Sequence, residues 1–112
     1  MSAVISVADA LARLPGAEGK PFATAFTHGS LLVEIFAPRG VDTQQPHTRD
    51  EIYVVIKGSG ELLCGDTRTS FGQGDFIFAA AGTAHRFENF TDDLTVWVMF
   101  YGPEEGEIAG NS

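Results

Sequence analysis

The stretch QPHTRDEIYVVIKG (residues 45–58), together with GDFIFAAAGTAHRFEN (residues 74–89), carries most of the information about the fold of this chain. Each stretch joins an apolar run rich in β-branched and aromatic residues to polar side chains and to a closing Gly or Asn. Such runs between turn residues predict β-strands. The polar side chains include two imidazoles, a carboxylate and an amide, which are ligand types for a divalent transition metal.

Working outward, turn residues divide the rest of the chain into short segments typical of strands. The expected strands are 22–27, 31–37, 43–48, 51–57, 60–64, 67–71, 76–79, 84–90 and 94–102. One short helix is expected over residues 6–14, with Ser6 as its N-cap and Asp9 in its first turn. Many evenly spaced short strands predict an all-β fold, either an antiparallel sandwich or a barrel.

The chain has 112 residues, a length that suits one domain with one hydrophobic core. We expect residues 1–21 to form the helix and a lead-in, residues 22–102 to form the barrel, and residues 103–112 to be a mobile tail. Strands 51–57 and 94–102 are apolar on both faces, which predicts that a second copy covers one of them in a homodimer. The alternative is that both faces are covered within one chain.

The alternation of side chains along a strand suggests how the polar residues meet. Residues two apart share a face, so Gln45 and His47 point the same way, and Glu51 joins them if residues 48–50 are extended. His85 joins them if strands 43–48, 51–57 and 84–90 are neighbours. Burying such groups without partners is unfavourable, and a bound metal would supply the partner.

The two stretches resemble the motifs of the cupins, small jelly-roll proteins built on a double-stranded β-helix. In the first cupin motif the second His corresponds to His47, the Glu to Glu51 and the closing Gly to Gly58. The second motif is matched in register by four residues: Gly74, Gly82, His85 and Asn89. The short separation of the motifs is similar to that of compact, single-domain microbial cupins.

Three positions depart from the cupin pattern. Gln45 replaces the first His, Ala80 replaces a Pro, and Gly40 is displaced by one residue. An amide oxygen is a harder and weaker ligand than an imidazole, which favours Fe(II) or Mn(II), with Ni(II) and Zn(II) as alternatives. Two alternatives remain for Gln45. It could bind the metal through a water molecule or hydrogen-bond the substrate, or it could mark a site that has lost its metal.

The resemblance implies a metal held by Gln45, His47, Glu51 and His85. It also implies a metalloenzyme of dioxygenase, isomerase or lyase type acting on a small oxygenated organic molecule. The alternative is a non-catalytic barrel that binds or senses a small molecule. The sequence assigns no catalytic residue, although Glu51 and Tyr53 are candidates because they share one strand face.

The net charge limits the kinds of partner that this protein is expected to bind. A net charge of −8 with only seven Lys and Arg argues against nucleic acid and anionic membranes as partners, so a small-molecule ligand is expected.

No signal peptide and no long apolar run are visible, and we expect a cytoplasmic protein. The single cysteine, Cys64, is expected in the core, and His28 is expected in an exposed turn.

Overall fold

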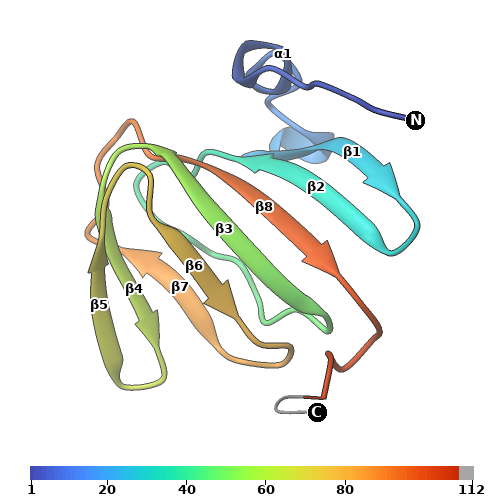
Figure 1. Ribbon diagram of the computed structural model, residues 1–112. Coiled ribbons are helices and arrows are strands. Elements are labelled where there is room, and N and C mark those ends of the chain that lie inside the picture. Colours follow the sequence, from blue (N-terminus) through green and yellow to red (C-terminus); the bar gives the residue numbers. More distant parts are fainter. Residues whose placement is uncertain (109–112) are drawn as a thin grey trace.

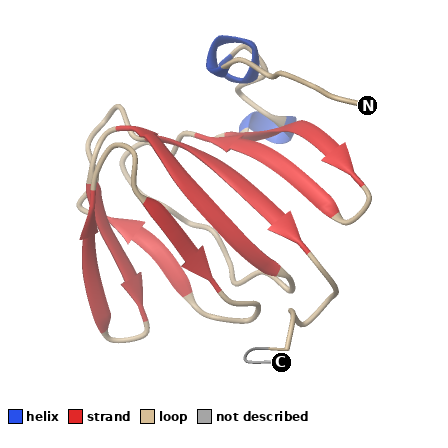
Figure 2. Ribbon diagram, in the orientation of Figure 1, coloured by secondary structure: helices blue, strands red, loops and turns tan. Residues whose placement is uncertain are grey.

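The computed structural model describes residues 1–108 and contains two antiparallel β-sheets with one short α-helix (Figures 1 and 2). The helical segments are α1 (Val7–Leu11) and a 3₁₀ turn, η1 (Ala17–Gly19). The strands are β1 (Phe22–His28), β2 (Leu31–Phe36), β3 (Asp50–Lys57), β4 (Gly60–Cys64), β5 (Thr67–Phe71), β6 (Phe76–Ala79), β7 (His85–Glu88) and β8 (Thr95–Tyr101). The predicted all-β class is therefore confirmed.

The strands divide into a five-stranded sheet, in the order β1-β2-β8-β3-β6, and a three-stranded sheet, in the order β5-β4-β7. Strands β3 and β8 lie side by side in the larger sheet, although more than 35 residues separate them in the sequence (Figure 1). The sheets turn their inner faces toward each other, which is the arrangement of a jelly-roll sandwich.

The main core fills the space between the two sheets. Alternate residues of β3 and β8, including Tyr53, Val55, Val96 and Val98, point inward and are almost fully buried. The smaller sheet supplies Phe87, whose ring centroid lies 5.0 Å from that of Tyr53. Burial of these aromatic and branched side chains is the main stabilising contribution to the sandwich.

Helix α1 covers part of the outer face of the larger sheet, next to β1 and β2 (Figure 1). Ala10 of the helix is buried against Ala25 and Ile35. Ser6 caps it as predicted, because its hydroxyl accepts a 3.0 Å hydrogen bond from the Asp9 amide. The prediction that the helix runs to residue 14 is wrong: it ends at Leu11, and the Arg13 side chain instead donates to carbonyls of β1.

The predicted strand at 43–48 is also wrong. Residues 43–47 have no regular secondary structure, and the following strand begins at Asp50. Asp42 explains the irregular path, because its carboxylate accepts hydrogen bonds from the Gln44 amide and from the Phe87 amide of β7. A side chain that binds backbone amides in this way competes with a strand ladder.

Beyond the barrel, the amide of Glu107 donates to Asp50 and the amide of Glu105 donates to the Thr48 carbonyl. The mobility expected for residues 103–112 stays a prediction, and residues 109–112 lie outside the described part of the chain. Within residues 1–108, the helices are too short and too polar to cross a membrane.

Candidate metal centre

Three of the four predicted ligands meet at one end of the sandwich. His47 lies in the loop before β3, Glu51 is the second residue of β3, and His85 is the first residue of β7. Glu51 Oε1 lies 3.2 Å from His47 Nδ1 and 2.7 Å from His85 Nε2. The potential ligand atoms of these three residues all lie within 4.8 Å of one another, so the group could hold a metal ion.

Contacts between the two sequence motifs hold His47 in place. Its backbone carbonyl accepts a 2.7 Å hydrogen bond from the amide of Gly82. Asp50 accepts a 2.9 Å hydrogen bond from the neighbouring amide of Ala81. The His47 ring packs on Phe100 of β8, with ring centroids 4.8 Å apart. The loop that carries His47 is therefore fixed to the turn before β7.

The orientation of His85 leaves one ring nitrogen free for a metal. Its Nδ1 lies 2.8 Å from the backbone carbonyl of Thr83, a contact that requires Nδ1 to carry a proton and donate. Nε2 then points at Glu51, and the Tyr53 hydroxyl lies 3.0 Å from it. A carbonyl that fixes the ring through the remote nitrogen is the usual support of a metal-bound histidine.

The charges of these groups depend on one another. Burial alone would raise the pKa of Glu51, but hydrogen bonds from His47 and His85 outweigh it, and the net shift of this pKa is downward. Burial alone would lower the pKa of His85, but hydrogen bonds to Glu51 and Thr83 shift it upward overall. Without a metal, the two groups therefore favour each other's charged forms.

The second oxygen of Glu51 provides a test of whether the site fits a metal. Glu51 is 1% exposed, and its Oε2 is buried with no hydrogen-bond partner among the described residues. Leaving a buried carboxylate oxygen unpaired is costly. A divalent cation held by two imidazoles and this carboxylate would remove that cost, so the donor set fits a metal.

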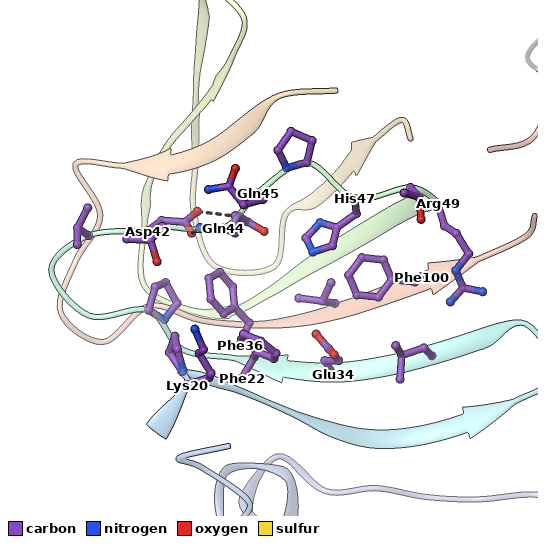
Figure 3. Close-up of a pocket in the computed structure, with 18 residues that line it drawn as sticks. Lys20, Phe22, Glu34, Phe36, Asp42, Gln44, Gln45, His47, Arg49 and Phe100 are labelled. Atoms are coloured by element: carbon purple, nitrogen blue, oxygen red, sulfur yellow. Dashed lines mark hydrogen bonds between the residues drawn. The ribbon is translucent and has the colours of Figure 1, made fainter. Parts of the chain in front are cut away.

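The two adjacent glutamines behave differently. Gln45 is exposed at the rim of the pocket, whereas the half-buried Gln44 accepts a 3.1 Å hydrogen bond from the Tyr53 hydroxyl. The Gln44 amide group also donates to Asp42 (Figure 3). The role of Gln45 as a ligand stays a prediction, and the sequence reasoning missed Gln44. Alternation along a strand cannot predict which of the two glutamines faces the site, because residues 43–47 do not form a strand.

A pocket of about 480 Å³ opens beside His47 (Figure 3). Its walls include Leu32, Phe36, Val98 and Phe100, which are apolar. Glu34 of β2 also lines it, and sequence reasoning missed this residue too. A signal was present, because Glu34 is the one charged residue in the apolar segment 31–37 and has the same parity as Leu32 and Phe36.

The other residues considered in the sequence lie as follows. Tyr53 is fully buried on the same strand face as Glu51, as its parity predicted. Burial raises the pKa of the Tyr53 hydroxyl, which therefore keeps its proton. Asn89 has a φ of 50° and follows β7, so it acts as a turn residue. His28 is exposed at the end of β1, and Cys64 is only half-buried.

Comparison with known proteins agrees with this architecture. The model of the cupin domain family matches residues 32–101, which is more than half of the chain. The chain therefore belongs to the cupin domain family, and the predicted resemblance is confirmed.

A curated relative, an uncharacterised protein of Streptomyces coelicolor, is 38% identical over 63 residues, which are 56% of this chain and 60% of that protein. Among solved structures, a cupin-2 domain protein from Shewanella frigidimarina superposes with a TM-score of 0.71 at 13% identity, covering 88% of this chain and 95% of that one. KdgF from Halomonas gives 0.62 at 21% identity, covering 75% and 79%. The DMSP lyase DddQ from Ruegeria pomeroyi gives 0.62 at 25% identity, covering 80% and 51%.

Proposed function

We propose that this protein is a small metalloenzyme that binds a divalent transition metal through His47, Glu51 and His85. The observation that carries the proposal is the buried Glu51 carboxylate, with one oxygen shared by two histidines and the other unpartnered. Two imidazoles and one carboxylate favour Fe(II) or Mn(II), with Ni(II) and Zn(II) as alternatives. Gln45, at the pocket rim, is proposed as a fourth and weaker ligand.

The pocket beside these residues supports a small oxygenated organic molecule as the substrate. A volume of about 480 Å³ suits a small molecule, and the walls combine apolar side chains with polar groups such as Glu34 and Gln44 that could orient it. When bound, the metal would supply Lewis acidity or oxygen activation. Dioxygenase, isomerase and lyase chemistry are the proposed reaction types. The likeness to the DMSP lyase DddQ supports testing lyase chemistry first.

The chain itself contributes orientation and a fixed proton. Thr83 holds the His85 ring, and Gln44 holds the Tyr53 hydroxyl, so neither ring can turn freely. Tyr53 keeps its proton and donates it to Gln44, and its oxygen lies 3.0 Å from His85 Nε2. We propose that Tyr53 positions His85, and that Glu51, as a metal ligand, cannot serve fully as a base as well.

Elemental analysis of untagged protein tests this proposal. The comparison is between wild type, the His47→Ala/His85→Ala double variant and His28→Ala, which removes an exposed histidine that is not part of the metal-binding group. We expect one Fe, Mn, Ni or Zn per chain in wild type and in His28→Ala, and none in the double variant. Absence of metal from wild type after reloading with each ion would refute the proposal.

The second candidate function is a non-catalytic barrel that binds or senses a small molecule, and the pocket supports it equally. A screen of oxygen consumption and of turnover of small hydroxy acids, sugar acids and DMSP by Fe(II)-loaded protein separates the two. Thermal stabilisation by a compound without turnover would favour the binding function.

We also infer that the protein is a cytoplasmic homodimer that pairs through the outer face of its larger sheet. Phe76 and Phe78 of β6 are 65% and 49% exposed, respectively. A second apolar groove on this face is lined by Phe26, Val33, Val54, Trp97 and Met99. Large exposed apolar faces favour association. Light scattering should give twice the monomer mass, and the monomer mass at high concentration would refute the pairing.

A further inference from the structure

Glu34 is a charged side chain on the inner face of the sandwich. It takes no part in the hydrogen bonds and ion pairs described above. Its neighbours of the same parity on β2, Leu32 and Phe36, pack in the main core. Across the sheet, Glu34 pairs with Val98 of β8, and Val98 pairs with Tyr53 of β3. Two strand spacings put the Cα atoms of Glu34 and Tyr53 roughly 10 Å apart.

This position places Glu34 in the wall of the pocket that His47 also lines, and His47 is the member of the metal-binding set that faces this pocket. Figure 3 shows Glu34 on β2, directed into the pocket toward His47. It is not among the groups whose ligand atoms lie within 4.8 Å of one another, so it stands outside the metal-binding set. The gap between Glu34 and that set is part of the pocket itself.

The Glu34 carboxylate also has no partner of its own. Among residues 1–108 its oxygens take part in none of the side-chain hydrogen bonds or ion pairs of the structure, although nearly every other buried or half-buried acidic group does. Burial raises the pKa of Glu34, and the nearby charge of His47 only partly offsets this effect. The Glu34 oxygens are not among the buried unpaired atoms of the described residues, so water can reach them, and a ligand that displaces this water must supply the donor.

We propose that Glu34 accepts a hydrogen bond from a hydroxyl group of the bound ligand, and that the pocket takes a small hydroxy acid. The inference rests on the proposed metal site, which would bind the oxygens of the same molecule from the other side. A carboxylate on the ligand matches Lys20 in the pocket wall, whereas the other lining cation, Arg49, donates to the backbone carbonyls of Ser30 and Gly102. Glu34 is thus the residue that selects ligands with an O–H group.

Matched probes test this assignment: glycolate carries the O–H group, and methoxyacetate has the same oxygens with the proton replaced by methyl. Binding of each probe to Co(II)-loaded protein is measured by the change in visible absorption of the metal. We expect wild type to prefer glycolate. Glu34→Leu should weaken glycolate about ten-fold or more while leaving methoxyacetate unchanged, because a charge-assisted hydrogen bond is lost. Glu34→Gln keeps a neutral acceptor, so its affinity for glycolate should lie between those of wild type and Glu34→Leu.

Glu61→Gln, a change of the same kind on β4 in the other sheet, is the control and should bind both probes as wild type does. Glycolate affinity that is equal in wild type and Glu34→Leu, with Co(II) bound normally in both, would overturn the role of Glu34 alone. Failure of Co(II)-loaded wild type to bind glycolate would overturn the ligand class. Failure of wild type to bind Co(II) would overturn the proposed metalloenzyme and this inference with it.

Discussion

The backbone amide of Gly82 donates a 2.7 Å hydrogen bond to the backbone carbonyl of His47. This contact joins the two motif-bearing stretches of the sequence, residues 45–58 and 74–89, at the position of His47. Gly82 has a φ of +75°, a conformation that residues with a Cβ adopt at a cost. The turn before β7 and the loop before β3 therefore behave as one support for the metal-binding residues.

We predict that Gly82→Ala destabilises the fold by about 1–2 kcal/mol, the cost of a left-handed backbone for a residue with a Cβ. The added methyl meets no atom within 4 Å, so backbone strain is the only source of the cost. Metal affinity should fall as well, because the strained turn holds His47 less well. Gly29→Ala, in the β1–β2 hairpin at a φ of +57°, should cost a similar amount of stability with metal affinity unchanged. Chemical denaturation measures the stability of both variants, and metal titration measures their affinity for the metal. Equal metal affinity in Gly82→Ala and Gly29→Ala would contradict the supporting role of Gly82.

His85→Ala should abolish metal binding, whereas Gln45→Ala should only weaken it. His85 is buried, with Nε2 aimed at Glu51, and Gln45 is exposed at the pocket rim. Isothermal titration with Mn(II) or Co(II) compares the two variants. If His85→Ala binds metal as tightly as wild type does, the assignment of the ligands is incorrect.

The stability of the metal-free protein should depend on pH in a bell shape. The folded-state pKa of His85 is raised, so its contribution is complete below its unfolded pKa and is lost as the pH rises through the folded pKa. The pKa of Glu51 is lowered, so its contribution is present above its unfolded pKa and is lost as the pH falls through the folded pKa. Thermal melts of metal-free wild type and His85→Ala across pH test this, and identical profiles would contradict it.

Metal affinity should rise with pH across the raised pKa of His85. Below that pKa a metal must displace the proton on Nε2, so the metal and the proton compete for one lone pair. Proton release on metal addition, measured in a weakly buffered solution, should increase as the starting pH is lowered through this range. Metal affinity that does not vary with pH would show that His85 does not bind through that nitrogen.

Phe87→Ala should destabilise the protein by about 3–5 kcal/mol, because it removes a buried aromatic ring from the centre of the sandwich. Phe87 is 1% exposed, and its ring packs on Tyr53, Phe71 and Phe36. Denaturant unfolding measures the loss, and a change below about 1 kcal/mol would mean that the core closes around the gap.

Much of the architecture could be predicted from the sequence because it follows from local patterns. The apolar runs at 51–57 and 60–64, bounded by Gly58 and Gly65, gave strands close to β3 and β4. The spacing of His47, Glu51 and His85 indicated one metal site, and these three residues do lie together. Their spacing is informative because His47 lies just before β3, and Glu51 and His85 lie at the starts of β3 and β7, whose registers are fixed by burial.

The loop from 43 to 48 could not be predicted in the same way. Alternation along a supposed strand put Gln45 beside His47, but Asp42 binds the backbone amide of Gln44 and breaks the pattern. The same carboxylate also accepts a hydrogen bond from the backbone amide of Phe87, which lies 45 residues later in the chain. No local pattern contains such a contact.

By itself, the sequence determined the all-β class, most of the strands and, within a predicted set of four ligands, the three residues of the candidate metal centre. Side-chain alternation and turn residues act over a few positions, so local patterns reveal these features. Only the tertiary structure decided which groups face that centre. Gln44 reaches Tyr53 across a loop, the Thr83 carbonyl fixes His85, and Glu34 enters the pocket from β2. These placements depend on which strands pair across the sheet and how the two sheets pack, and both are set by contacts between residues distant in the sequence.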